Sequence, residues 1–168
     1  FTHLAVTTST KNVSYDISAD VINEYIYAAS WGGMLRRFKY SDINPVWEVI
    51  PLPMDNQDEL NCSDGTGYSD NYYYSPIDPD RGYFNHKPFS VHIVKDDSDD
   101  QVQWVWVGTA DGINKGRIQN GEIGIDWTHY KNIEESEQFL DDWVTGIYSQ
   151  KLQDGTNDFT RIWAVCWV

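Results

Sequence analysis

The sequence has few basic residues, and no long run of apolar ones. Lysine and arginine number 12 against 26 aspartates and glutamates, which gives a formal net charge of −14. Proteins that bind nucleic acid or anionic membranes need clustered lysine and arginine to meet phosphate groups. A membrane-spanning helix needs roughly 18 or more consecutive apolar residues. We therefore expect no nucleic-acid partner and no membrane span.

Cysteine is also scarce. Cys62 and Cys166 are the only two, which is too few for a disulfide framework, and they do not form a metal-binding pair. Two alternatives stay open: the two cysteines form a disulfide, or Cys166, which sits in an apolar strand pattern, is a buried free thiol. No signal peptide is visible and the chain begins with Phe1, so we interpret it as a mature or excised part of a longer protein.

Aromatic residues, in contrast, are abundant. They make up 15% of the chain, with eight tryptophans and eleven tyrosines, and apolar residues make up 40%. Flat rings pack well on the pleated surface of a sheet. Helical periodicity is nearly absent, and only residues 132–143 are expected to form a short helical turn. The composition therefore indicates an all-β fold.

One sequence pattern occurs three times along the chain. It reads YIYAASWGGMLRRF at 25–38, WVWVGTADGINKG at 104–116 and RIWAVCWV at 161–168. Tyr27 and Trp106 align at a separation of 79 residues, and the same alignment places Gly33 over Gly112 and Arg36 over Lys115. In the third copy, Trp163 follows Trp106 by 57 residues. A short strand precedes each copy, and polar hairpin tips are expected at 19–24, 95–103 and 149–160.

Each full unit therefore has four antiparallel strands, which predicts a β-propeller. The strands of a β-sandwich would also show alternating apolar and polar residues. A sandwich gives no reason, however, for a tryptophan to recur at the same position of each unit, as Trp47 and Trp127 do. We expect these two rings to pack between neighbouring blades. We expect the innermost strands to be 25–31, 104–110 and 161–167, because Ala28, Ala29 and Gly108 are small enough for the crowding around a central channel.

The predicted organisation is about two and a half four-stranded blades of a propeller fragment. Residues 54–87 are rich in Asp, Asn, Gly, Ser and Pro without a sustained period, so they are interpreted as a loop and not as an extra strand pair. The expected divisions are an outer strand of a preceding blade at 1–11, a blade at 12–53, the inserted loop at 54–87, a blade at 88–131, and a linker with half a blade at 132–168.

Two stretches resemble a known family. VWVGTADGINK followed by DWTHYKN, and YAASWGGMLRR followed by WEVIPLP, are similar to blades of secreted bacterial propellers. Those propellers are of the sialidase-like (Asp-box) and two-component-regulator types, as found in type IX-secreted surface proteins. The resemblance implies an extracellular or cell-surface location, with other blades of the same protein as partners. The Asp-box pattern itself survives only in part, in SDINPVW at 41–47 and NGEIGIDW at 120–127.

The candidate binding residues lie mainly in the inserted loop. Tyr72, Tyr73 and Tyr74 offer rings to a carbohydrate or a protein partner, unless they cover an open strand edge. Asp64 and Asp70 belong to an acidic stretch that suits Ca²⁺, although no spaced calcium-binding motif is present. The tip at 95–100 is a weaker calcium candidate, and His86 and His92 lack a third ligand in register. No other cofactor is expected.

Catalysis has little support in the sequence. A sialidase-type reaction needs an arginine cluster for the substrate carboxylate, but Arg36 and Arg37 are neighbours on a predicted strand and so face opposite ways. We expect a non-catalytic extracellular propeller that acts as a binding or structural module. The alternative is part of a glycan-active propeller enzyme, a sialidase-like hydrolase or lyase, with its catalytic residues mostly outside this sequence.

Overall fold

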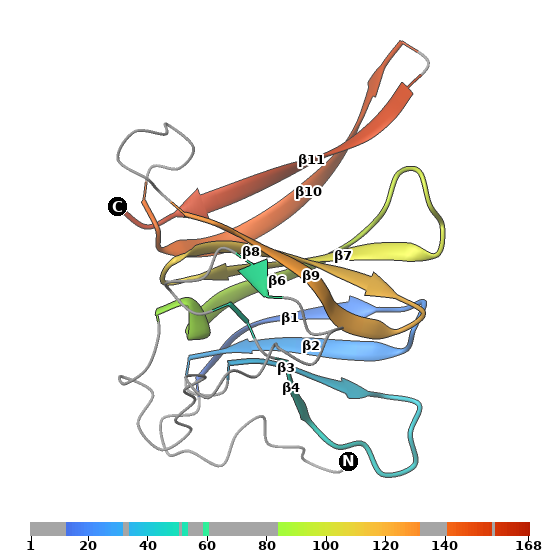
Figure 1. The fold of residues 1–168 in the computed structure, drawn as a ribbon, viewed down its shortest axis with the longest axis vertical. Helices are drawn as coiled ribbons and strands as arrows, with labels where there is room; N and C mark the ends of the chain where they lie inside the picture. Colours follow the sequence, from blue (N-terminus) through green and yellow to red (C-terminus); the bar gives the residue numbers. More distant parts are fainter. Residues whose placement is uncertain are drawn as a thin grey trace.

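The computed structural model describes residues 13–31, 34–50, 52–53, 59–60, 84–131, 141–155 and 157–168. These residues form three antiparallel β-sheets in succession along the chain (Figure 1). The helical segment within the described ranges is a single 3₁₀ turn, η1, at Phe84–His86. The prediction of an all-β, antiparallel fold is therefore confirmed.

Sheet 1 contains the first four strands in the order β1-β2-β3-β4. Their bounds are β1 Ser14–Asp20, β2 Tyr25–Ser30, β3 Met34–Lys39 and β4 Glu48–Ile50. Alternate residues point to opposite faces of each strand. One face of sheet 1 presents Tyr27, Ala29, Leu35 and Ile50, which are all buried.

Sheet 2 has five strands in the order β5-β9-β8-β7-β6. The bounds are β5 Glu59–Leu60, β6 Pro88–Lys95, β7 Val102–Thr109, β8 Gly112–Gln119 and β9 Glu122–Tyr130. The interpretation of 54–87 as loop alone was wrong at β5, which pairs with β9 through Glu59–Thr128 and Leu60–Trp127. An exposed strand edge favours the addition of another strand, and β5 covers part of the outer edge of β9.

Sheet 3 is a hairpin of two long strands, β10 Val144–Asp154 and β11 Asn157–Cys166. The polar tip expected at 149–160 was placed too broadly, because pairing continues out to Asp154 and Asn157. The hairpin therefore projects beyond the other sheets (Figure 1). Lys151 and Thr160 anchor its outer part by bonding to the Asp97 carboxylate of sheet 2.

The alignment of the first two repeats slips by one residue at the turn between their second and third strands. Ser30 pairs with Met34 in sheet 1, whereas Thr109 pairs with Gly112 in sheet 2, so the first turn is one residue longer. In the structural alignment of the two repeats, Met34 therefore corresponds to Gly112. Both residues have a positive φ, of 59° and 93°. The predicted match of Arg36 with Lys115 was wrong, and Arg37 is the counterpart of Lys115.

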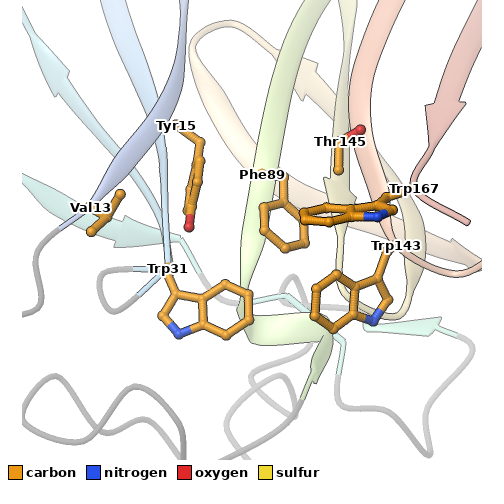
Figure 2. A pocket seen from close by; sticks show the side chains of 7 residues that line it. All are labelled: Val13, Tyr15, Trp31, Phe89, Trp143, Thr145 and Trp167. Atoms are coloured by element: carbon orange, nitrogen blue, oxygen red, sulfur yellow. The ribbon is translucent and has the colours of Figure 1, made fainter.

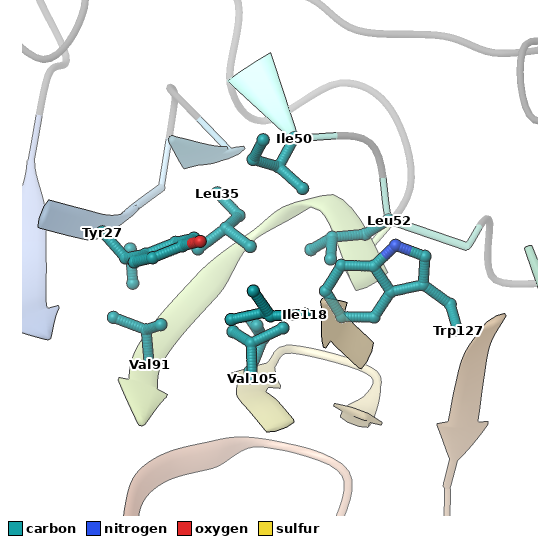
Figure 3. Close-up of a cluster of buried hydrophobic side chains, with 10 residues drawn as sticks. Tyr27, Leu35, Ile50, Leu52, Val91, Val105, Ile118 and Trp127 are labelled. Atoms are coloured by element: carbon teal, nitrogen blue, oxygen red, sulfur yellow. The ribbon is translucent and has the colours of Figure 1, made fainter. Parts of the chain in front are cut away.

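Sheets 1 and 2 pack face to face across the main core (Figure 3). Tyr27, Leu35 and Leu52 come from the sheet 1 side, and Val105, Ile118 and Trp127 come from sheet 2. A smaller cluster of Ile113, Val144 and Ile147 joins sheet 2 to sheet 3. Burial of these apolar side chains contributes roughly 25 cal/mol per Å² removed from water, so the three sheets are held by contacts between successive faces.

The strands predicted to be innermost are the second strands of the three repeats, β2, β7 and β11, and that position was wrong, because the first strands β1, β6 and β10 lie at the edges of the sheets and meet one another. β6 packs against β1 on one side and against β10 on the other. Two side chains of β1 bond to the backbone of β6: Asp16 Oδ2 accepts from the Val91 amide at 3.0 Å, and Ser18 Oγ accepts from the Ile93 amide at 3.2 Å. These contacts satisfy edge amides that another strand would otherwise bond.

Gly108 of β7, one of the small residues predicted to lie around a channel, is in close contact with β6 and β10. A Cβ on Gly108 would lie 2.5 Å from Ser90 Oγ and 2.5 Å from the Val144 carbonyl oxygen. Gly108 is therefore small because β6 and the start of β10 press against it, and crowding around a channel is not needed to explain it.

Trp47 and Trp127 occupy equivalent positions in their sheets, because Trp47 contacts Phe38 as Trp127 lies against Gly116, the counterpart of Phe38. Packing between two sheets is confirmed for Trp127 and stays a prediction for Trp47, because no sheet that precedes sheet 1 lies within the described residues. Trp127 is only 1% exposed and lies in the core between sheets 1 and 2. Trp47 is partly exposed and stacks edge-on against Phe38, with a centroid distance of 4.6 Å. Phe38 lies on the face of sheet 1 that points away from sheet 2, because it neighbours Arg37, whose side chain reaches Tyr27 in the core.

Both ends of the insertion are tied into sheet 2. The fully buried Asn85 of η1 donates to the Pro53 carbonyl at 2.7 Å and exchanges hydrogen bonds with the Asn114 side chain. Thr109 Oγ1 also donates to Asn85 Oδ1 at 2.9 Å. The segment from 84 onward is therefore part of the core structure.

Candidate functional site

The first strand of each repeat, β1, β6 or β10, carries a bulge at the same point. The register of β1 with β2 breaks at Tyr15, that of β6 with β7 at Phe89, and that of β10 with β11 at Thr145. A bulge redirects the side chain of its extra residue and increases the local twist. These three residues therefore occupy the same position in three successive sheets.

A backbone hydrogen bond recurs beside each bulge. The amide of Trp31 donates to the Val13 carbonyl, that of Ala110 to Lys87, and that of Trp167 to Trp143, at 3.1, 3.2 and 2.8 Å. The residues that flank each first strand pair are thus held in the same way in all three sheets. The backbone therefore has the same hydrogen-bonded arrangement beside the bulge in all three repeats. The side chains at these positions differ from one repeat to the next.

These positions enclose a pocket of about 520 Å³ at the end where the three sheets meet (Figure 2). Its volume lies within the roughly 300–1,000 Å³ usual for small-molecule sites. The described residues that line it are Val13, Tyr15, Trp31, Phe89, Trp143, Thr145 and Trp167. Sheet 1 supplies the first three, β6 supplies Phe89, and the ends of sheet 3 supply the others.

Phe89 is the centre of the ring cluster. Its centroid lies 5.2 Å from that of Tyr15, 5.3 Å from that of Trp31 and 5.7 Å from that of Trp143. Phe89 is 7% exposed, whereas Trp143, Tyr15 and Trp167 are 37%, 53% and 66% exposed. Edge-to-face and tilted contacts of this kind are favourable for aromatic pairs. A buried ring therefore supports outer rings whose surfaces remain open to a ligand.

The outer rings face different directions. Trp31 and Trp143 are tilted by 56° at a centroid distance of 6.3 Å, and Trp143 and Trp167 are nearly perpendicular at 87° and 6.2 Å. Figure 2 shows Trp31 and Trp143 entering from opposite sides, with Trp167 above Trp143. The pocket thus has several apolar walls instead of one flat platform.

The described residues of the lining are uncharged. None of the seven lining residues carries a formal charge at neutral pH, and their polar groups are a phenol, a threonine hydroxyl and indole N–H groups. The nearby Lys87 ammonium lies over the Trp31 ring at 5.2 Å and over Phe84 at 4.5 Å. Lys87 is buried, so its cation–π contact supports Trp31 from outside the set of lining residues.

Most of the predicted site residues cannot be placed. Tyr72, Tyr73, Tyr74, Asp64, Asp70 and Cys62 lie outside the described residues, so the loop site and the calcium site stay predictions. Within the described residues, Cys166 has no disulfide partner and is half-buried at the end of β11. Since Cys62 is not described, the Cys62–Cys166 disulfide also stays a prediction.

The acidic tip at 95–100 is described, and its carboxylates have protein partners. Asp96 Oδ1 accepts from Ser98 and Asp99, and Asp96 Oδ2 accepts from Trp104 Nε1 at 2.6 Å. These hydrogen bonds, chiefly from Ser98 and Trp104, hold the pKa of Asp96 far below its usual value. Asp100 pairs with Lys95. Within the described ranges, no three potential metal ligands from His, Cys, Asp or Glu come together.

Arg36 and Arg37 are adjacent on β3 and face opposite ways, as expected. Arg37 donates to the Glu48 carboxylate at 2.9 Å, to the Gly121 carbonyl at 2.7 Å and to the Tyr27 hydroxyl. Burial raises the pKa of Tyr27 to about 12, despite the opposing influence of Arg37. Burial alone would lower the pKa of Arg37, but Tyr27 and Glu48 outweigh it and raise it. Arg37 is therefore engaged within the fold.

The aromatic pocket was not predicted from the sequence, although one signal for it was available. Trp31, Ala110 and Trp167 follow the second strand of the three repeats at the separations already found, 79 and 57 residues. A tryptophan therefore occurs at this strand end in two of the three repeats. What the pattern does not reveal is the bulge at Tyr15, Phe89 and Thr145, because a bulge changes register without changing composition.

Comparison with known proteins gives no relative for this chain: no family model, curated protein or solved structure matches it. Within the described ranges, the structure contains no helix with the length and apolar character needed to cross a membrane.

Proposed function

We propose that this chain is part of an extracellular β-propeller that serves as a non-catalytic binding module, with the aromatic pocket as its ligand site. The observation that carries the proposal is the pocket itself, which three successive sheets build from equivalent positions. Loops and strand ends on a rigid scaffold are common places for binding residues. Exposed aromatic rings gathered on such a scaffold are a usual feature of binding surfaces.

The propeller is supported by the way in which the sheets succeed one another. Tyr27, Trp106 and Trp163 are equivalent in the repeat, and the first two pack towards the next sheet. Trp163 lies on the far face of sheet 3, the face away from sheet 2, which it shares with Tyr148 and Val165. These three side chains are 49%, 62% and 49% exposed. In the proposal, a further sheet of the same polypeptide covers this face.

Binding is favoured over catalysis by the chemistry of the lining. General acid–base or nucleophilic catalysis needs titratable side chains placed against one another. The pocket offers the Tyr15 and Thr145 hydroxyls among apolar groups, and Thr145 already donates to the Val165 carbonyl at 3.3 Å. Arg37, which a glycan-active enzyme would need for a substrate carboxylate, is held by Glu48 and Gly121.

The test measures binding and turnover together. The purified protein is run in affinity electrophoresis against a panel of extracellular polysaccharides, and the same mixtures are assayed for new reducing ends. We expect retardation by at least one polysaccharide without release of reducing ends. Release that disappears in Arg36→Ala or Arg37→Ala would favour the enzyme alternative. Failure of every polysaccharide to retard the protein would contradict the binding module.

A further inference from the structure

We infer that the aromatic pocket binds a short neutral oligosaccharide by stacking sugar rings on its tryptophans. The inference rests on the proposed binding function and names the class of ligand for the same site. It follows from the charge of the lining, from the orientation of the rings and from the position of Lys87. Each of these limits the ligand in a different way.

The charge of the pocket favours an uncharged ligand. The seven lining residues present neutral donors and acceptors only, and the whole chain carries a formal net charge of −14. A sugar acid would therefore meet no cationic side chain among these seven described residues, because the nearby Lys87 is only 4% exposed, and it would approach a protein of like charge. Neutral hydroxyl groups, in contrast, match the phenol, threonine hydroxyl and indole N–H groups at the walls.

The position of Lys87 argues against a cationic ligand. Aromatic boxes also bind quaternary ammonium groups through the negative faces of their rings. Here the Lys87 ammonium already occupies such a position, 5.2 Å from the centroid of Trp31. One cation–π position at that ring is therefore already occupied. The seven described lining residues also include no carboxylate that could pair with a cationic ligand.

The ring orientations suit a pyranose chain. A pyranose has a C–H face that is apolar and a rim of hydroxyl groups, so one side stacks on an aromatic ring while the rim forms hydrogen bonds. Trp143 and Trp167 offer two walls at 87° to each other, which can contact successive sugars that are turned relative to one another. Trp143 packs against the buried Phe89, so this ring needs less ordering on binding, which reduces the entropic cost.

The experiment is isothermal titration calorimetry of the 168-residue chain with three ligand sets. They are neutral gluco-, manno- and galacto-oligosaccharides of increasing length, oligogalacturonate as a charged counterpart, and tetramethylammonium chloride. The test variants are Trp167→Ala and Trp143→Ala. The matched control is Trp163→Ala, because Trp163 is also an exposed tryptophan but lies on the far face of sheet 3. Circular dichroism confirms that each variant is folded.

We expect at least one neutral oligosaccharide to bind. Trp167→Ala and Trp143→Ala should each weaken its binding by about tenfold or more, whereas Trp163→Ala should change it by less than about twofold. Sugar binding that is indifferent to Trp143 and Trp167 would overturn the inference but leave the binding module in place. Binding of tetramethylammonium or oligogalacturonate alone, with the same dependence on Trp143, would overturn only the class of ligand. Absence of binding by any of the three sets would contradict the inference and the proposed function together.

Discussion

The two tryptophans at one position of the repeat differ in burial within the described residues. Trp127 fills the space between sheets 1 and 2, where Gly116 makes room for it: a Cβ on Gly116 would lie 2.7 Å from the Trp127 ring. Trp47 packs on Phe38 on the opposite side of sheet 1 and is partly exposed. The shared position therefore does not imply a shared energetic contribution.

This difference predicts unequal losses of stability. Trp127→Ala should lower the free energy of unfolding by about 3–5 kcal/mol, as expected for a large buried ring. Trp47→Ala should cost less than half as much, because part of its surface already contacts water. Urea denaturation followed by circular dichroism measures both. Equal losses would show that Trp47 is as well packed as Trp127.

A conservative variant gives an independent check on Trp127. Its Nε1 is buried and has no hydrogen-bond partner in the described part of the chain. Trp127→Phe removes this unsatisfied donor and keeps much of the apolar ring. It should therefore be clearly less harmful than Trp127→Ala, because an unpaired buried polar group itself costs free energy.

At the scale of the element, the contacts between first strands determine how the sheets are joined. His92 of β6 is partly buried against β10, and its Nε2 lies 2.8 Å from Ser149 Oγ. Burial lowers the pKa of His92 below 6.5, although the nearby Asp16 carboxylate opposes this. The neutral imidazole is therefore the form that the contact between sheets 2 and 3 favours.

The sign of the resulting pH dependence is defined. Because the pKa of His92 is lower in the folded state, this contribution to stability is present above pH 6.5 and is lost as the pH falls through the folded-state value. Proton NMR titration of the ring resonances, assigned with His92→Gln, measures that value. We expect a midpoint below 6.5 in the native protein and a shift towards 6.5 in urea. A native midpoint at or above 6.5 would show that β10 does not desolvate the ring.

The elements themselves could largely be predicted from the sequence, but their relative register could not. Alternation in YIYAAS and WVWVGT identifies β2 and β7, because a half-covered strand needs that period. The slip that places Arg37 over Lys115 depends on a turn that is one residue longer in sheet 1. The sequence is compatible with a glycine-containing turn of either length. The burial of Asn85 could not be predicted either, because an asparagine in a polar loop is usually exposed.

At the scale of the whole molecule, the candidate site exists only where the sheets converge. Tyr15 and Trp167 are far apart in the sequence and line one pocket because β1 and β10 both pack against β6. Composition predicted that aromatic rings would be available for binding, and the repeat predicted successive sheets. Neither specifies which ends of the strands come together, since this depends on three bulges and on the order in which the sheets stack.

Contact between a neutral sugar and the rings of this pocket is the central claim about this protein. The chain has eight tryptophans, so its ¹H–¹⁵N correlation spectrum contains eight indole resonances, each of which can be assigned by substitution. Titration with the neutral oligosaccharide that binds best should shift the resonances of Trp31, Trp143 and Trp167. The resonances of Trp47, Trp104, Trp106, Trp127 and Trp163 should stay in place. Shifts confined to this second group, or no shifts at a saturating concentration of sugar, would contradict the account.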